Sequence, residues 1–241
     1  MPRQPFRLVA NKYRDGQVRI GRDAIAIQPE IFALVGQCLI AWPNVEAEMA
    51  LALGQLLGAP NEAALAVFQT LRKSLSQRDA VAAAAVCQGE QDRELINAIL
   101  NAHASVESER NGLAHGHLGA IMPMNDAILW MNTADYIAFK SLITLKGDRD
   151  YNEKKREQLY SSLSYYRRKD VEDILLSIDE IGWIWSELIK YLQAKRPEKR
   201  AELYSQLCDR PRIARELETL RQKNNSSTQP RPAKPNPSGT A

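Results

Sequence analysis

Apolar residues recur at intervals of three and four along several long stretches of this 241-residue chain. The clearest stretch covers about 168–194, where one face holds Val171, Ile174, Leu175, Ile178, Ile181, Trp185, Leu188 and Leu192. This spacing places side chains on one side of an α-helix, and the other side of the stretch is charged. Such a helix packs into a bundle or against a partner chain, so the pattern predicts a helical fold.

Further helices follow from the same spacing. A long helix is expected from about Gln28, ending before Gly58 and Pro60, with a kink or break at Pro43. Its apolar face holds Leu34, Cys38, Trp42, Val45, Met49, Leu53 and Leu56. Helices are also expected over 61–73, with Asn61 as the cap, and over 77–87, 92–113, 133–145, 151–163 and 198–222.

Two short apolar runs break the helical pattern. His117–Met122 and Ala127–Met131 flank a turn-like Pro-Met-Asn-Asp sequence, which predicts a small β-hairpin. We therefore expect an all-α fold with a hairpin inserted at 117–131. An N-terminal arm (1–24) would precede a helical domain (25–195), a C-terminal helical extension (196–222) and a disordered tail (223–241) rich in Ser, Pro and Asn.

Composition narrows the class of protein. Hydrophobic residues make up 44% of the chain and aromatic residues 7%, a balance that favours helix. No apolar run approaches the roughly 18 residues that span a bilayer, and the first residues lack a signal-peptide layout. The three cysteines are far apart in the sequence. We expect a soluble cytoplasmic protein without a membrane partner.

The net charge of +3 is unevenly distributed. Residues 1–22 carry +5 and residues 195–241 carry +6, so that residues 23–194 carry −8. Basic ends attract polyanions such as RNA. Solvated tails are the more ordinary explanation.

A polar group interrupts the apolar face of the helix expected at 92–113. Arg110 lies on that face, where a guanidinium is costly to desolvate unless it has a partner or borders a cleft. His115 follows five residues later, about 140° around the axis of an intact helix. Gly112 and Gly116 would let the helix end or turn so that the two side chains converge. A second subunit is the other way to complete the site.

These residue types suit RNA cleavage without a metal. Arg110 offers a planar fork of donors that matches a phosphate, and His115 can move protons near neutral pH. The ribose 2′-hydroxyl supplies the nucleophile, and Asn111 adds a neutral donor and acceptor. The pair His115 and His117 could suggest a metal, but the chain has only three histidines and no cysteine or acid beside this pair. We expect no metal and no other cofactor.

The run Glu109-Arg110-Asn111-Gly112-Leu113-Ala114-His115-Gly116 resembles the signature of HEPN domains. That signature is an Arg, then four to six residues, then a His, often with Asn directly after the Arg. The segments 41–46 (Ala-Trp-Pro-Asn-Val-Glu) and 165–170 also resemble parts of such domains, so the resemblance covers about residues 28–194. It implies an antiparallel helical bundle that dimerises, with the Arg and His motifs meeting at a shared cleft.

Many HEPN proteins are metal-independent endoribonucleases, often toxins or antiviral defence factors. The resemblance therefore implies that Arg110 binds the phosphate, His115 transfers protons and Asn111 positions them. RNA, a second copy of the chain, and an antitoxin or other protein are the implied partners. Two alternatives stay open. One is a non-catalytic HEPN-like module that binds RNA or protein, and the other is a structural helical scaffold.

Two residues are candidates for supporting the site. Glu46 lies on the same stripe as Trp42, so we expect it to point inward and hypothesise that it pairs with Arg110 and orients the guanidinium. His103 lies on the face of Arg110, seven residues earlier. We interpret it first as a core or interface histidine, with a role in the site as the alternative.

A second basic group holds Arg167, Arg168 and Lys169, interleaved with Tyr160, Tyr165 and Tyr166. Cations beside stacking rings suit single-stranded RNA. A solvated helix face with tyrosines packed beneath it is the interpretation we prefer. Trp183 and Trp185 point to different sides of one helix, which predicts that one lies in the core and the other at an interface.

Overall fold

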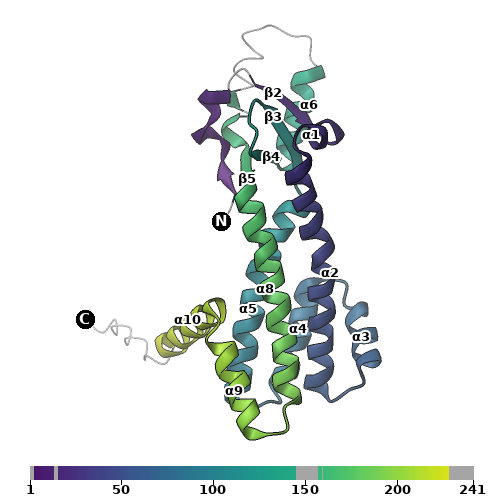
Figure 1. The fold of residues 1–241 in the computed structure, drawn as a ribbon, viewed down its shortest axis with the longest axis vertical. Coiled ribbons are helices and arrows are strands. Elements are labelled where there is room, and N and C mark those ends of the chain that lie inside the picture. The colour runs from purple at the N-terminus through teal and green to yellow at the C-terminus, as the bar shows by residue number, and fades with distance from the viewer. Residues whose placement is uncertain (1–2, 14–15, 145–156, 159, 228–241) are drawn as a thin grey trace, which may run out of the picture. The chain divides into compact units, whose positions relative to one another are not determined.

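The computed structural model describes residues 3–13, 16–144, 157–158 and 160–227 (Figure 1). The chain divides into two compact units. The first, the sheet unit, comprises Met1–Ala52 and His103–Ser186. The second, the helical unit, comprises Leu53–Ala102 and Glu187–Ala241. The chain is mostly helical, as the apolar spacing predicts.

The sheet unit holds α1 (Arg22–Ile27) and α6 (Thr133–Thr144) and parts of α2 (Pro29–Leu57), α5 (Glu90–Ala114) and α8 (Arg168–Gln193). The helical unit holds the remaining parts of those three long helices. It also holds α3 (Asn61–Thr70), α4 (Ser74–Ala85), α9 (Pro197–Cys208) and α10 (Pro211–Ser227). No single helix among the described residues is long and apolar enough to cross a membrane, although the bent pair α2 and α3 passes that test jointly.

The expected hairpin exists, but it is the centre of a larger sheet. Strands β3 (His117–Met122) and β4 (Ala127–Met131) pair antiparallel, with His117 opposite Met131. They are joined by β1 (Gln4–Pro5), β2 (Gln17–Ile20) and β5 (Ser164–Arg167) in the order β1-β5-β4-β3-β2. The residues expected as an N-terminal arm thus supply both edge strands. Two to four residues show too little alternation to be read as strands, and their partners lie far along the sequence.

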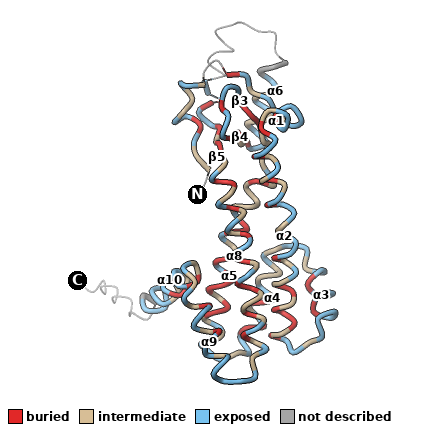
Figure 2. The backbone as a smooth tube through the Cα atoms, in the orientation of Figure 1, coloured by how far each residue is buried: buried red, intermediate tan, exposed pale blue. Residues whose placement is uncertain are grey.

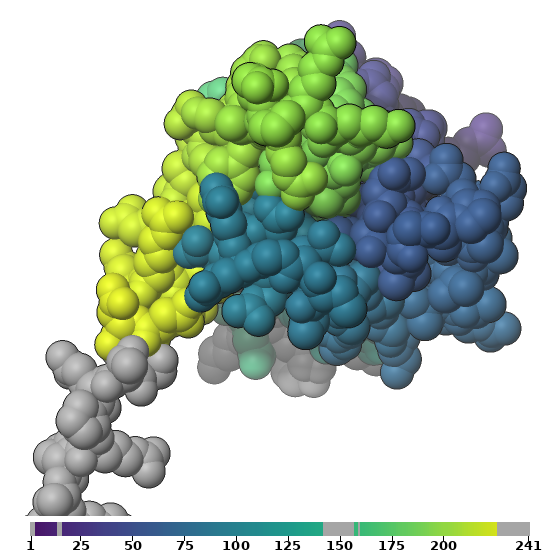
Figure 3. Space-filling model, turned by 90° about the horizontal axis from the view of Figure 1, so that it is seen from below, coloured from purple at the N-terminus to yellow at the C-terminus, as the bar shows by residue number. Residues whose placement is uncertain are grey.

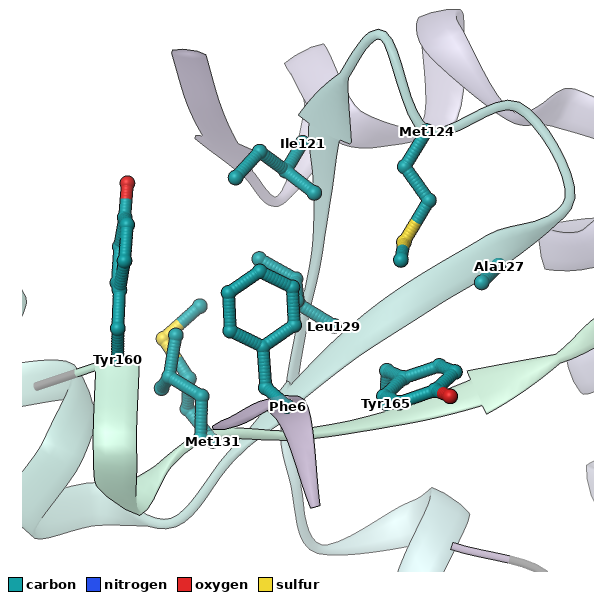
Figure 4. Close-up of a cluster of buried hydrophobic side chains, with 9 residues drawn as sticks. Phe6, Ile121, Met124, Ala127, Leu129, Met131, Tyr160 and Tyr165 are labelled. Carbon is teal, nitrogen blue, oxygen red and sulfur yellow. The ribbon is translucent and has the colours of Figure 1, made fainter. Parts of the chain in front are cut away.

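An apolar cluster holds the sheet together (Figure 4). Phe6 is fully buried, and its ring meets the rings of Tyr160 and Tyr165 edge-on, with centroids 5.5 and 6.4 Å away. Strands β3 and β4 and the loop between them supply the aliphatic side of the cluster, from Ile121, Met124, Ala127, Leu129 and Met131. The N-terminal segment is therefore packed into the unit by one aromatic anchor.

The long helices bury the faces that the spacing predicts, and Figure 2 shows buried positions recurring along α5 and α8. In α8 the buried set includes Val171, Ile174, Ile178, Ile181, Trp185 and Leu188. Of the two neighbouring tryptophans, Trp185 is fully buried and Trp183 is 62% exposed. The split between a core and a surface tryptophan is thereby confirmed.

Two expected helix boundaries are wrong, those at Asn61 and within 198–222. At Pro43, where a kink or a break is expected, α2 continues without a break; that side of the helix is exposed, so that the carbonyl deprived of its donor can bind water. Asn61 is the first residue of α3, with Pro60 in the cap position. The helix expected at 198–222 is two helices, because Pro211 begins α10. Helix α10 extends to Ser227, and most of the helix expected at 151–163 lies outside the described residues.

Polar contacts attach α9 and α10 within the helical unit. The Tyr191 hydroxyl of α8 and the Arg200 guanidinium of α9 both donate to the Asp92 carboxylate near the start of α5. Arg221 of α10 pairs with Glu94 at 3.0 Å. Figure 3 shows the yellow residues of α10 against the teal residues of this part of α5. The start of α5 is thus the anchor for both C-terminal helices.

Candidate functional site

Arg110 is held in a half-buried position near the end of α5. Its Nη1 donates to the Asn111 side-chain oxygen at 2.8 Å, and its guanidinium carbon lies 4.9 Å from the centre of the Trp42 ring. Its Nε is buried and has no hydrogen-bond partner among the described residues. The apolar spacing of α5 turns Arg110 toward α2, and the indole there covers one face of the cation.

The surroundings of Arg110 act on its pKa in opposite directions. Burial lowers the pKa by penalising the charged form, while the carboxylates of Glu46 and Glu107 raise it. The net direction is downward, although an arginine remains charged in proteins. The side chain is therefore a partly desolvated cation whose environment only partly compensates its charge.

Glu46 is engaged by Trp42. The indole Nε1 donates to the Glu46 carboxylate at 2.9 Å, across one turn of α2. Glu46 thus acts on Arg110 by electrostatic attraction and by fixing the indole that the guanidinium covers. An indirect orientation of Arg110, through the ring, is what this geometry provides.

His103 is fully buried between two tryptophans of the sheet unit. The Trp185 indole donates to its Nδ1 at 3.1 Å, and the Trp42 ring centre lies 5.0 Å from its own. Because Nδ1 accepts this hydrogen bond, the neutral ring carries its proton on Nε2. His103 is thus a core histidine that packs against the same indole as Arg110.

His115 lies elsewhere on the helix. Its backbone N–H donates to the Asn111 carbonyl at 3.0 Å, so the helical path continues through Gly112 to His115. His115 directly follows the last residue of α5, Ala114, and this hydrogen bond keeps it about 140° from Arg110 around the helix axis. The imidazole is exposed. One copy brings together Arg110, Asn111, Glu46 and His103, but not His115.

The two glycines of the motif serve close packing rather than a turn. Neither has a positive φ, the conformation that a turn would require; among described residues only Gly21 and Gly58 have it. A Cβ added to Gly116 would overlap the Trp130 indole, and one added to Gly112 would lie 2.8 Å from the Tyr166 hydroxyl. Helix α5 ends at Ala114, between the two glycines, as expected. The expected turn is corrected, because neither glycine provides it; they admit two aromatic side chains of the sheet instead.

Trp130 contacts the end of α5, and no sequence pattern predicted this contact. From β4, its Nε1 donates to the Gly112 carbonyl at 2.6 Å, and the Arg3 guanidinium lies 3.7 Å from its ring centre. Burial raises the pKa of the neighbouring Tyr166, which Arg3 lowers and Glu109 raises. These contacts attach the end of α5, next to His115, to the sheet. A tryptophan on a short strand gives no signal of this contact in sequence.

The remaining candidate site residues make other contacts. His117 stacks on Tyr136 with ring centres 4.1 Å apart, and no group of three potential metal ligands is found among the described residues. Arg167 pairs with Asp170, Arg168 with Glu30 and Glu172, and Lys169 with Asp173. The three tyrosines interleaved with them are buried. A phosphate approaching these cations would have to compete with their carboxylate partners.

Comparison of the chain with protein-family models, with curated proteins and with solved structures finds no match.

Proposed function

We propose that the chain is a metal-independent endoribonuclease of HEPN type, built as an antiparallel helical bundle that acts as a dimer. The observation that supports it is the state of Arg110, a partly desolvated guanidinium held on Asn111 and Trp42 with an unpartnered Nε among the described residues. A cation fixed in this way stabilises charge that develops on a phosphate, because little reorganisation is needed. The exposed His115 lies five residues later and can exchange protons with a substrate.

The active site pairs two copies. Because Arg110 and His115, the residue that follows α5, point about 140° apart around the helix axis, one phosphodiester meets both only if a second copy supplies one of them. A two-fold axis makes the contacts reciprocal, so a dimer holds two sites, each with Arg110 from one copy and His115 from the other. The basic chain ends add long-range attraction for RNA.

The reaction needs no metal. The ribose 2′-oxygen attacks the phosphorus, the new O–P bond forms, and the bond to the 5′-oxygen breaks. The products are a cyclic phosphate and a 5′-hydroxyl. His115 takes the proton of the 2′-hydroxyl or supplies the one that the 5′-oxygen gains, and water exchanges the other. Arg110 stabilises the charged phosphorane. Asn111 holds the guanidinium in position.

A structural scaffold is the second candidate, and the packing of Arg110 on Trp42 is the observation that favours it. In that case Arg110 serves only to join α5 to α2. Arg110→Ala would then lower the stability of the chain, and RNA would be neither bound nor cut. A binding module without turnover would retain RNA affinity.

The decisive experiment co-expresses two inactive variants. Pure protein is incubated with a mixed RNA pool in EDTA, and we expect cleavage that leaves cyclic phosphate ends. Arg110→Ala and His115→Ala should each slow it by roughly 100-fold or more. Heterodimers of the two variants, isolated with two tags, should recover about half of the wild-type rate, because one of their two sites is intact.

Two matched variants serve as controls. Arg93→Ala changes an exposed arginine of the same helix, and His117→Ala removes a histidine two residues beyond His115. Both should cleave RNA at close to the wild-type rate. Undiminished cleavage by Arg110→Ala or His115→Ala, loss of all cleavage in EDTA, or heterodimers as inactive as their parents would each contradict the proposal.

A further inference from the structure

A hollow of about 280 Å³ opens on the surface of the sheet unit between α2 and α8. Its lining includes the apolar residues Val45 and Ile178, together with Gly182. Trp183 forms one side and is 62% exposed. An indole left this far in water beside an unfilled hollow is apolar surface that a ligand can cover.

The charge around the hollow has one sign. Glu48 of α2 and Asp179 of α8 line it. Helix α2 contains no Lys or Arg, and α8 contains none between Asp170 and Lys190. Two carboxylates beside an exposed indole attract a cation both by opposite charge and by a cation–π contact with the ring face. A second copy presenting the same acidic face would be repelled, so the hollow suits a basic occupant.

The chain itself contains a segment of this chemistry. Residues 228–241, outside the described part, read Thr-Gln-Pro-Arg-Pro-Ala-Lys-Pro-Asn-Pro-Ser-Gly-Thr-Ala, with two cations, four prolines and no acid. Proline-rich segments favour an extended helix with three residues per turn, which fits aromatic-lined grooves at a low entropy cost. Arg231 and Lys234 are three residues apart, which is the spacing that a helix of this kind places on one side.

We propose that the hollow between α2 and α8 is a peptide-docking site, and that its occupant is the chain's own segment 228–241. The prolines cover Trp183, and Arg231 and Lys234 pair with Glu48 and Asp179. The proposal does not depend on ribonuclease activity, because none of these residues belongs to the Arg110 site.

The test uses a fluorescein-labelled peptide of residues 228–241 and full-length protein, with binding measured by fluorescence anisotropy. The R231E/K234E variant, whose own segment no longer competes, should bind the peptide saturably and more tightly than the wild type. In that background, Trp183→Ala and the double change E48K/D179K should each weaken binding at least about ten-fold. Added salt should weaken it further, because the charges are exposed.

Glu62→Lys, on exposed α3, reverses one charge away from the hollow and should leave binding unchanged. Circular dichroism checks that Trp183→Ala, at an exposed position, keeps the helical content. The proposal is overturned if the R231E/K234E variant shows no saturable binding, if Trp183→Ala binds as tightly as its parent, or if the wild type binds as tightly as R231E/K234E. A dimer that Trp183→Ala dissociates, with no peptide binding, would assign the hollow to a second copy instead.

Discussion

At the scale of single residues, the packing of the sheet against the end of α5 restricts which residues can stand near His115. Gly116 is required because the Trp130 indole occupies the space of a Cβ. The same indole donates to the Gly112 carbonyl, one of the carbonyls near the helix end that need a donor. His115 is therefore held on a helix end that the sheet fixes from one side. The motif glycines are explained by packing on this aromatic ring.

Gly116→Ala should destabilise the chain by about 1–3 kcal/mol, because the new methyl group displaces Trp130 and strains its hydrogen bond. Gly36→Ala is the matched control, since nothing lies within 4 Å of a Cβ added at that position of α2. It should stabilise the chain by roughly 0.5–1 kcal/mol through the helix propensity of alanine. Urea unfolding measures both changes. Equal effects of the two substitutions would exclude this role for Gly116.

At the scale of elements, α9 is attached to the helical unit by a coupled set of polar groups. Asp92 accepts from both Tyr191 and Arg200, and the Arg200 guanidinium lies 4.4 Å from the Tyr191 ring centre. Burial, followed by the hydrogen bond to Asp92, raises the pKa of Tyr191 to about 12. The tyrosine thus holds its proton more tightly in the folded chain than in the unfolded one.

This shift predicts a pH dependence at the alkaline end. The stabilisation from Tyr191 is fully present below its unfolded pKa of about 10 and is lost as the pH rises toward the folded value of about 12. In Tyr191→Phe, the free energy of unfolding should fall less steeply across that range than in the wild type. Identical slopes in the variant and the wild type would contradict the assignment.

At the scale of the whole molecule, the fold is completed by contacts between distant parts of the sequence. The two edge strands of the sheet come from the first 20 residues, and they pair with strands that begin at His117 and Ser164. Phe6 fixes this arrangement because its ring is buried among residues from three other segments (Figure 4). The N-terminal residues are thus part of the sheet unit rather than an appendage to it.

Phe6→Ala should therefore cost about 3–5 kcal/mol, the range for removing a buried aromatic ring. Leu8→Ala removes an apolar side chain two residues away that is 68% exposed, and it should change stability by less than about 0.5 kcal/mol. Thermal unfolding compares the two. A similarly small change in both variants would mean that the N-terminal segment contributes little to the sheet unit.

The sequence by itself determined what is local. Spacing of three and four specified the long helices and their buried faces, and two short apolar runs with a turn between them specified the hairpin, because these signals are contained within a few turns or strands of chain. It also marked Arg110 as a cation on an apolar face.

Only the tertiary structure decided what depends on partners far along the chain. It made the hairpin the centre of five strands, placed His103 between Trp42 and Trp185, and set Trp130 against Gly116. It also kept α5 helical to Ala114, with the His115 N–H still bound to the Asn111 carbonyl, which separates that imidazole from Arg110 within one copy. The physical reason is that short strands and single-residue contacts gain their free energy from the partners they pack against, and those partners are not adjacent in sequence.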